Sequence, residues 1–239
     1  ETVWGGSPHN NTNPKAKDAL PRIRQLIFEG KNKEAQELCG PTICSQSANG
    51  MPYQTVGSLH LDFDGINEYN DYYRDLDLEK AIATTRFTAN GVTYTREAYT
   101  SFPDQVLVIR LTASQKKSIS FTAKYSTPYK SSVIRCISPR KELQLNGKAN
   151  DHEGIEGKVE FTALTRIENN GGKLEILSDS TLQVKDANSV ILYVSIGTNF
   201  VNYKDVSGDA LNSAQQYLKL VNKNYPKSKA SHINAYQKY

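Results

Sequence analysis

Residues 82–99 of this chain, IATTRFTANGVTYTREAY, decide the class of fold. The segments on both sides of Asn90 and Gly91 are rich in threonine, aromatic and other strand-forming residues. Asn-Gly is the strongest short-range signal for a two-residue hairpin, because a type I′ turn requires positive φ at both central positions. The sequence therefore predicts two antiparallel strands, at 82–89 and 92–99, joined by a tight turn.

Similar segments lie before and after this hairpin. Leu59, Leu61 and Phe63 alternate with polar residues, which is the period-2 pattern of a half-buried strand. Further strands are predicted around 75–77 and at 106–113, 118–125, 158–168, 173–178, 181–184 and 190–196. The last of these, VILYVSI, is apolar enough for a central strand buried on both faces, and the sequence NNGG at 169–172 predicts a second hairpin. Roughly ten strands without intervening helices exclude a parallel α/β sheet and predict an antiparallel sandwich.

Helices are predicted before this β region. Asn13-Pro14 is typical of a helix start, and Pro21 predicts a break followed by a new helix that ends at Gly30. A further helix capped by Asn32 completes a small helical hairpin over about residues 14–39. Its single apolar stripe requires packing against another surface.

Helices are also predicted after the β region. Residues 210–221 carry a clean apolar stripe, and Tyr225-Pro226 is expected to end that helix. Ser228 or Ser231 is expected to cap a last helix that runs to Tyr239, where no C-cap follows. We therefore expect the polypeptide to continue beyond this point.

Composition excludes several classes of protein. The 29 Lys and Arg against 25 Asp and Glu give a formal net charge of +4, too mild and too evenly spread to indicate nucleic-acid or anionic-membrane partners. With 38% hydrophobic residues, no apolar run approaches the ~20 residues of a membrane span. The 3 cysteines are too few for a disulfide framework, although a local bridge between Cys39 and Cys44 stays open.

The carboxylates form no recognisable catalytic or metal site. No P-loop, dinucleotide fingerprint, HExxH motif or nucleophile elbow occurs, and we expect no metal ion and no cofactor. Asp62, Asp64 and Gly65 resemble the start of a calcium loop, but the glycine and glutamate that such a loop needs further on are absent. Asp75 and Asp77 share one face of a strand, too close together for the two carboxyl groups of an inverting glycosidase.

Two groups of aromatic residues are candidates for binding. Tyr69, Tyr72 and Tyr73 cluster in a segment rich in Asn and Asp, and this combination suits sugar recognition. Tyrosine is also an ordinary strand residue, so a structural role is the alternative. Trp4 stands in a glycine-rich segment and needs a partner surface, either the core of this domain or a neighbouring domain.

The opening ETVWGGSPHNNTNPKAKDALPRIRQLIFEGKNKEAQEL, followed by YQTVGSLHLDF, resembles the N-terminal domain of glycoside hydrolase family 95. The later sequences YRDLDL at 73–78 and FPDQV at 102–106 resemble it too. One departure is Ser58, where the family pattern has an acid after the glycine. The resemblance is close over about half of the chain and looser over the rest.

The resemblance implies a mainly β chain, an antiparallel β-supersandwich with a small N-terminal helical hairpin and C-terminal linker helices. Residues 1–205 would form the sandwich domain, and residues 206–239 would lead to an (α/α)₆ barrel outside this chain. The catalytic residues of such enzymes lie in the barrel, so none is assigned here. Thr2 and Trp4 would lie at the substrate rim or at the interface with the barrel.

The same resemblance implies that the parent protein is an inverting α-L-fucosidase or α-L-galactosidase, exported to the periplasm or the cell exterior. Its partners would be its own barrel and a fucosylated oligosaccharide, and the isolated chain would be inactive. A stand-alone carbohydrate-binding module, motivated by Tyr69, Tyr72 and Tyr73, is the alternative. The equivalent sandwich of maltose or kojibiose phosphorylases is a third possibility.

Overall fold

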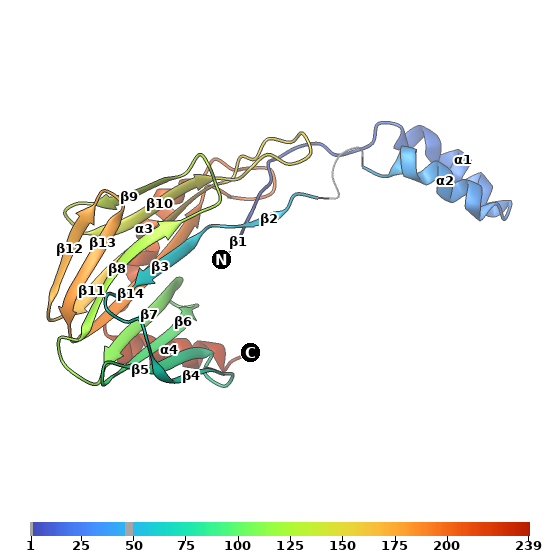
Figure 1. Ribbon diagram of the computed structural model, residues 1–239. Helices are drawn as coiled ribbons and strands as arrows, with labels where there is room; N and C mark the ends of the chain where they lie inside the picture. Colours follow the sequence, from blue (N-terminus) through green and yellow to red (C-terminus); the bar gives the residue numbers. More distant parts are fainter. Residues whose placement is uncertain (1, 46–49) are drawn as a thin grey trace.

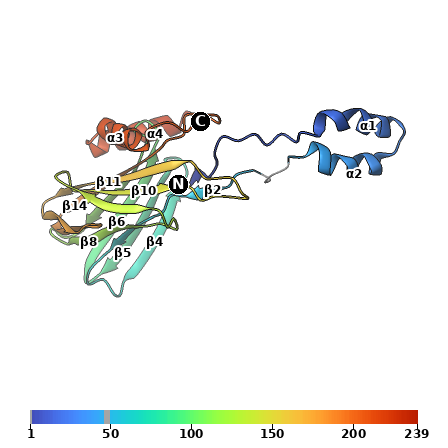
Figure 2. The same ribbon diagram turned by 90° about the horizontal axis from the view of Figure 1, so that it is seen from above.

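The computed structural model describes residues 2–45 and 50–239, with the side chain of Thr2 outside the described part. The main body is a β-sandwich, and a helical hairpin projects away from one end of it (Figure 1). Viewed from above, two further helices lie together on one face of the sandwich (Figure 2). The mainly β, antiparallel fold predicted from the sequence is confirmed.

Two sheets build the sandwich. The large sheet has 8 strands, in the order β4 (Asn70–Asp77), β5 (Ile82–Ala89), β6 (Val92–Ser101), β7 (Val106–Ala113), β14 (Ser189–Thr198), β11 (Glu160–Asn170), β10 (Glu142–Lys148) and β9 (Val133–Ile137). The small sheet has 4 strands, in the order β12 (Lys173–Ser178), β13 (Thr181–Ala187), β8 (Ile119–Ser126) and β3 (Ser58–Asp62). A separate pair joins β1 (Thr2–Trp4) to β2 (Tyr53–Thr55).

The main core lies between the two sheets. We call the face of the large sheet that packs on the small sheet its inner face. Phe121, Leu182 and Leu192 are 0% exposed in this layer. The small sheet packs on β7, β9, β10 and β11, whereas β4 to β6 extend beyond it. The large sheet therefore has a covered half and a half whose inner face is open.

The opposite, outer face of the large sheet is covered by the C-terminal helices. Helix α3 (Ala210–Leu220) packs on β14 and β11, and α4 (Tyr225–Tyr236) packs on β6. Ala214 and Leu218 are buried, as the apolar stripe predicted. Strand β14 thus has apolar layers on both faces, which confirms its prediction as a central buried strand.

The hairpin at Asn90 and Gly91 is confirmed, with φ of 50° and 74°. The second predicted hairpin is wrong. Strand β11 belongs to the large sheet and β12 to the small one, so residues 171–172 carry the chain from one sheet to the other. Gly171 and Gly172 have φ of 70° and 63°, so the glycines mark a sharp turn but not a pairing of neighbours.

Two more links between the sheets lie beside this one. Residues 114–118 join β7 to β8, and Asn188 alone joins β13 to β14. The Asn188 amide donates to the carbonyl of Asn170 at 2.8 Å, and its side-chain oxygen accepts from the Lys117 amide at 3.0 Å. One asparagine therefore ties three crossovers together at one end of the sandwich.

The N-terminal hairpin differs in detail from its prediction. Helix α1 (Ala16–Phe28) runs without a break through Pro21, and α2 (Asn32–Ile43) starts after a left-handed Gly30. Pro21 is exposed in the second turn, so it removes one hydrogen bond on the solvent side while Ile23 and Leu26 stay packed on Ala35. Packing against a second helix outweighs the loss of one backbone bond.

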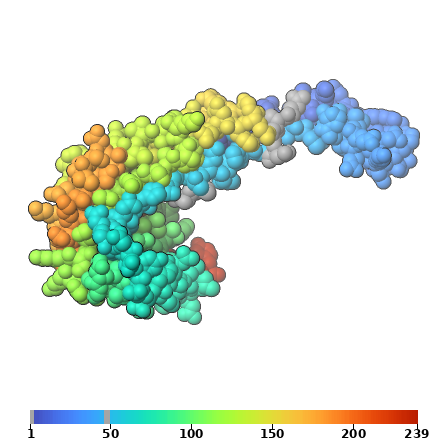
Figure 3. Space-filling view, viewed as in Figure 1, coloured from blue at the N-terminus to red at the C-terminus, as the bar shows by residue number. Residues whose placement is uncertain are grey.

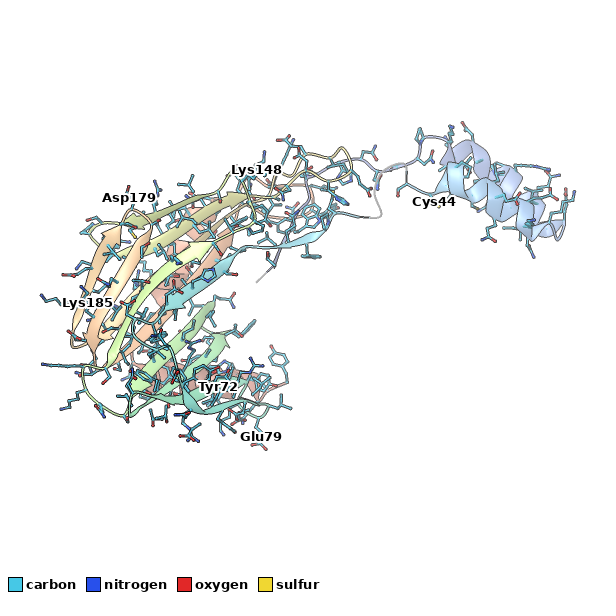
Figure 4. All side chains as sticks on the ribbon, viewed as in Figure 1. Cys44, Tyr72, Glu79, Lys148, Asp179 and Lys185 are labelled. Carbon is cyan, nitrogen blue, oxygen red and sulfur yellow. The ribbon has the colours of Figure 1, made fainter. Side chains whose placement is uncertain are left out.

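Asn13 holds the base of this hairpin. Its Nδ2 donates to the carbonyls of Pro41 and Cys44 at 3.1 and 3.0 Å, and its Oδ1 accepts from the Lys15 amide. Figure 4 labels Cys44 at this base. The cysteines Cys39, Cys44 and Cys136 are all free, so the local bridge is not formed.

Other differences concern element boundaries. Strands β1, β2, β9 and β10 escaped prediction because each is short or lacks a clear alternation. The last helix begins at Tyr225 with Asn224 as N-cap, so Ser228 lies inside it, where it is 1% exposed. Proline is tolerated in a first helical turn, which is why Pro226 starts this helix instead of ending the previous one. No helix among the described residues combines the length and apolar character needed to cross a membrane.

Candidate functional site

Trp4 stands at the end of β1, opposite Tyr53 of β2. After Trp4 the backbone turns back across the Trp4 indole ring. A Cβ at Gly6 would lie 2.0 Å from Cζ2 of Trp4, so only glycine allows this passage. The Gly5 amide donates to the Pro52 carbonyl at 2.7 Å, which fixes the turn against β2. The glycine-rich segment thus positions Trp4, and Thr2 contributes its backbone to the same strand pair.

Trp4 lines a hollow of about 560 Å³. Its ring meets Phe200 edge-on, with centroids 5.8 Å apart. Tyr53 and Tyr203, which also line the hollow, are 75% and 71% exposed. Exposed aromatic side chains gathered in a concave surface are typical of an interaction site.

A second hollow of about 750 Å³ continues from the first, and both share Ile196 and Tyr217. It lies between β3 of the small sheet and the inner face of β6, β7 and β14, where Leu59, Leu107 and Val194 form apolar walls. Figure 3 shows the recess between the arm that carries β2 and the lobe formed by β4 to β6. We call the two hollows together the aromatic groove.

The described lining of the aromatic groove is uncharged. Among the described residues that line it, none is an Asp, Glu, His, Lys or Arg. Glycoside hydrolysis needs a proton donor and a second carboxylate, or an equivalent base, beside the scissile bond. The described lining is therefore suited to apolar contact with a ring or with another surface.

The tyrosine cluster is divided between two faces of β4. Tyr69 and Tyr72 have ring centroids 5.7 Å apart, and Tyr69 lies 5.9 Å from Phe87. Tyr73 instead packs under the guanidinium of Arg86, 5.6 Å away. Consecutive strand residues point to opposite faces, so the sequence cluster yields one pair of neighbouring rings and one separate ring.

Asp75 and Asp77 lie on β4 as predicted, opposite Thr84 and Ile82. Asp77 accepts a hydrogen bond from Lys80 Nζ at 2.6 Å, and this contact lowers the pKa of its carboxyl group. A catalytic proton donor requires a raised pKa, so Asp77 has the wrong electrostatics for that role. Within residues 2–45 and 50–239, no three His, Cys, Asp or Glu side chains gather closely enough to hold a metal ion.

A half-buried charge cluster ties α4 to the sheet. Glu97 of β6 accepts hydrogen bonds from Lys229 and from the Tyr225 hydroxyl. Burial raises the pKa of Glu97, but these two hydrogen bonds and the charges of Lys229 and Arg110 outweigh it, so the pKa is lowered overall. These contacts join α4 to β6, which indicates a structural role in holding the helix.

Comparison of the sequence with family models identifies the family of this chain. Residues 1–203 match the family model described as glycosyl hydrolase family 65, N-terminal domain. The chain belongs to this family. The N-terminal domain of glycoside hydrolase family 95, which the sequence resembles, is of this same type, so the recognition made from the sequence is confirmed.

Relatives of this glycosyl hydrolase N-terminal domain include "Alpha-L-fucosidase 2" of Arabidopsis thaliana, 30% identical over 84% of the chain and 26% of the relative. "Probable alpha-fucosidase A" of Aspergillus niger is 24% identical over 99% of the chain and 31% of the relative. The chain therefore spans between about a quarter and a third of the length of these proteins.

The fold of this N-terminal domain is also found in a solved structure. A putative kojibiose phosphorylase from the human microbiome matches with a TM-score of 0.50 at 10% identity, covering 78% of the chain and 28% of that protein. At this identity the likeness concerns the fold alone.

Trp4 could be predicted from the sequence, but the aromatic residues that line the same hollow could not. Tyr53, Phe200, Tyr203 and Tyr217 come from three separate segments, and only the fold brings them to one hollow. The signal was present in part, since Phe200 and Tyr203 stand in a polar segment directly after the apolar strand β14. Exposed aromatic residues just beyond a buried strand indicate a contact surface.

Proposed function

We propose that this chain is the N-terminal accessory domain of an inverting α-L-fucosidase-type glycoside hydrolase, which removes terminal fucose or α-L-galactose from glycans. The observation that carries the proposal is the aromatic groove, a concave surface lined by Trp4 and free of charged side chains among the described residues. Similarity to an α-L-fucosidase over 84% of the chain supports the same assignment.

In this proposal residues 1–205 form the sandwich domain, and residues 206–239 lead to an (α/α)₆ barrel that carries the catalytic residues. Trp4 and its groove lie against that barrel or at the rim of its active site. The chain itself requires no cofactor and performs no hydrolysis. A periplasmic or extracellular location belongs to the same proposal.

The test compares the chain with the full-length enzyme on 2′-fucosyllactose. We expect hydrolysis by the full-length protein and none by the chain alone. Trp4→Ala in the full-length enzyme is expected to lower kcat/KM at least about tenfold, because the indole anchors a buried contact surface. Its unfolding temperature is expected to change little.

Tyr236→Ala is the matched control, since Tyr236 is an aromatic residue of α4 that lies outside the groove and is 43% exposed. Unchanged kcat/KM in the Trp4→Ala enzyme would remove the role given to the groove. Hydrolysis by the isolated chain would overturn the accessory assignment.

Carbohydrate binding by the chain itself is a second candidate function. The exposed ring pair of Tyr69 and Tyr72, 58% and 54% exposed, favours it. Tyr73 lies on the other side of β4 and would contribute only indirectly. Saturable binding of an oligosaccharide that Tyr72→Ala weakens is the expected result, and binding unaffected by that substitution would exclude this surface.

A further inference from the structure

Arg96 of β6 is a half-buried cation for which the described residues provide no ion pair. Its Nε is buried and has no hydrogen-bond acceptor among the described residues, and its guanidinium lies 6.0 Å from the centre of the Phe63 ring. Burial lowers the pKa of Arg96, although an arginine remains protonated at neutral pH. A buried donor without an acceptor is unfavourable, and an anionic group that bonds to this guanidinium from outside the chain would offset that cost.

The strand register places a second arginine beside it. Arg74 of β4 lies opposite Thr85 of β5, and Thr85 lies opposite Arg96 of β6. Residues directly opposite one another point to the same face of a sheet. Arg74 and Arg96 are therefore two strand spacings apart, roughly 10 Å, on the inner face.

The neighbouring carboxylates lie on the other side of the sheet. Glu97 follows Arg96 in the strand and pairs with Lys229 of α4 on the outer face. Asp75 and Asp77 alternate with Arg74 in β4 and point to that outer face too. No ion pair among the described residues includes Arg74 or Arg96.

A row of aromatic rings runs beside the two arginines. Phe87 and Tyr94 stack with centroids 5.3 Å apart, and Tyr69 continues the row to Tyr72. Figure 4 labels Tyr72 on the lobe of the large sheet that extends beyond the small sheet. The open half of the inner face thus combines exposed rings with unpaired positive charge.

We infer that the inner face of β4 to β6 binds an anionic saccharide, whose carboxylate or sulfate groups bond to Arg96 and Arg74 while a sugar ring packs on Tyr72 and Tyr69. Guanidinium groups match carboxylate and sulfate oxygens in geometry, and tyrosine faces match the C–H face of a sugar. This inference rests on the proposed carbohydrate binding and adds the charge of the ligand to it.

The experiment is calorimetric titration of the chain with three oligosaccharides of equal length. The probes are a galacturonate trimer, a sulfated fucose trimer and a neutral galactose trimer, so that carboxylate, sulfate and uncharged ligands are distinguished. We expect at least one anionic trimer to bind at least about tenfold more tightly than the neutral one, with affinity that falls as salt rises.

Arg96→Gln is expected to abolish this preference for the anionic trimers. Arg86→Gln is the matched control, because Arg86 lies in the neighbouring strand β5 but stacks on Tyr73 away from this surface. It should leave all three affinities unchanged. Circular dichroism and the unfolding temperature establish that each variant is folded, and Arg74→Gln gives an exposed second variant.

The outcomes distinguish the inference of an anionic saccharide from the proposed carbohydrate binding on which it rests. Equal binding of neutral and anionic trimers would overturn the inference and leave the proposed carbohydrate binding standing. Absence of binding to all three trimers by the folded chain would overturn both. Binding of a hexaglutamate peptide as tight as that of the anionic trimers, and equally sensitive to Arg96→Gln, would assign the surface to a protein carboxylate and overturn the saccharide inference.

Discussion

The large sheet has two halves that are built differently. Around β14 the small sheet covers one face and α3 the other, and Leu192 and Val190 are 0% exposed. Around β4 and β5 the helix α4 lies near the outer face only, and Leu76 is 60% exposed on the inner one. Strands of one sheet thus form a closed core in one half and an open surface in the other.

This difference separates the half of the sheet that is buried in the core from the half that stays accessible. The covered half buries the apolar area that holds the domain together, since burial is the main favourable contribution to folding. The open half carries exposed rings and unpaired arginines, which contribute little to stability in the free chain. Substitutions in the covered half should therefore lower the free energy of unfolding, whereas substitutions in the open half should change it little.

The largest difference is expected between Leu192→Ala and Leu76→Ala. Leu192→Ala should lower the free energy of unfolding by about 4 kcal/mol, because it leaves a cavity between two packed layers. Leu76→Ala should change it by less than about 0.5 kcal/mol, because that side chain is already in contact with water. Denaturant titration of both variants measures the contrast, and equal losses would contradict the division into two halves.

The second prediction concerns an ion pair within the covered half. Arg166 Nη2 lies 2.7 Å from Glu142 Oε1, and Arg166 Nη1 donates to the Leu218 carbonyl of α3 at 2.9 Å. Glu142 has a side chain that is only 4% exposed, so Arg166→Ala leaves a carboxylate buried without a partner. We expect a loss of about 3 kcal/mol in denaturant titration. Arg74→Ala, an arginine of the open half, should cost almost nothing, and the reverse order would refute the argument.

The third prediction concerns the end of the sandwich where the aromatic groove joins the two halves. Gly6→Ala forces a methyl group against the Trp4 ring, so we expect about 1–3 kcal/mol of destabilisation and a change in Trp4 fluorescence. Gly40→Ala is the control, since a Cβ there meets nothing within 4 Å. An unchanged emission spectrum would show that the indole does not depend on this close passage.

The smallest effect is expected from mild acid on α4. The pKa of Glu97 is lowered in the folded chain from its ordinary value of 4.5. Its contribution is therefore fully present above about pH 4.5 and is lost as the pH falls through the lowered value. Hydrogen exchange of α4 should accelerate below pH 4.5 before that of β14 does, and Glu97→Gln should remove this pH dependence. Simultaneous acceleration of both elements would contradict it.

Local patterns predicted those parts of the fold that local interactions determine. The turn at Asn90-Gly91 and the apolar strand β14 follow from a few adjacent residues, and both were predicted. The link at 171–172 has the composition of a hairpin, yet it joins different sheets. Which strand pairs with which depends on long-range burial, and local turn chemistry does not contain that information.

The candidate site shows the same limit. Trp4 was recognisable because a tryptophan among glycines is unusual, whereas Phe200 and Tyr217 join it only through tertiary packing. No role for Arg96 could be predicted from the sequence, because a single arginine in a strand is ordinary until its register and its missing hydrogen-bond acceptor are known. The role of Thr2 stays a prediction, since its side chain lies outside the described residues.

The three crossovers tied by Asn188 have a mechanical consequence. They fix the two sheets together at one end of β14, while the aromatic groove lies at the other end, beside Thr198. Strand β14 has 10 residues and spans roughly 30 Å between these ends. The length of this buried central strand thus separates the end where the sheets are joined by crossovers from the end that carries the groove.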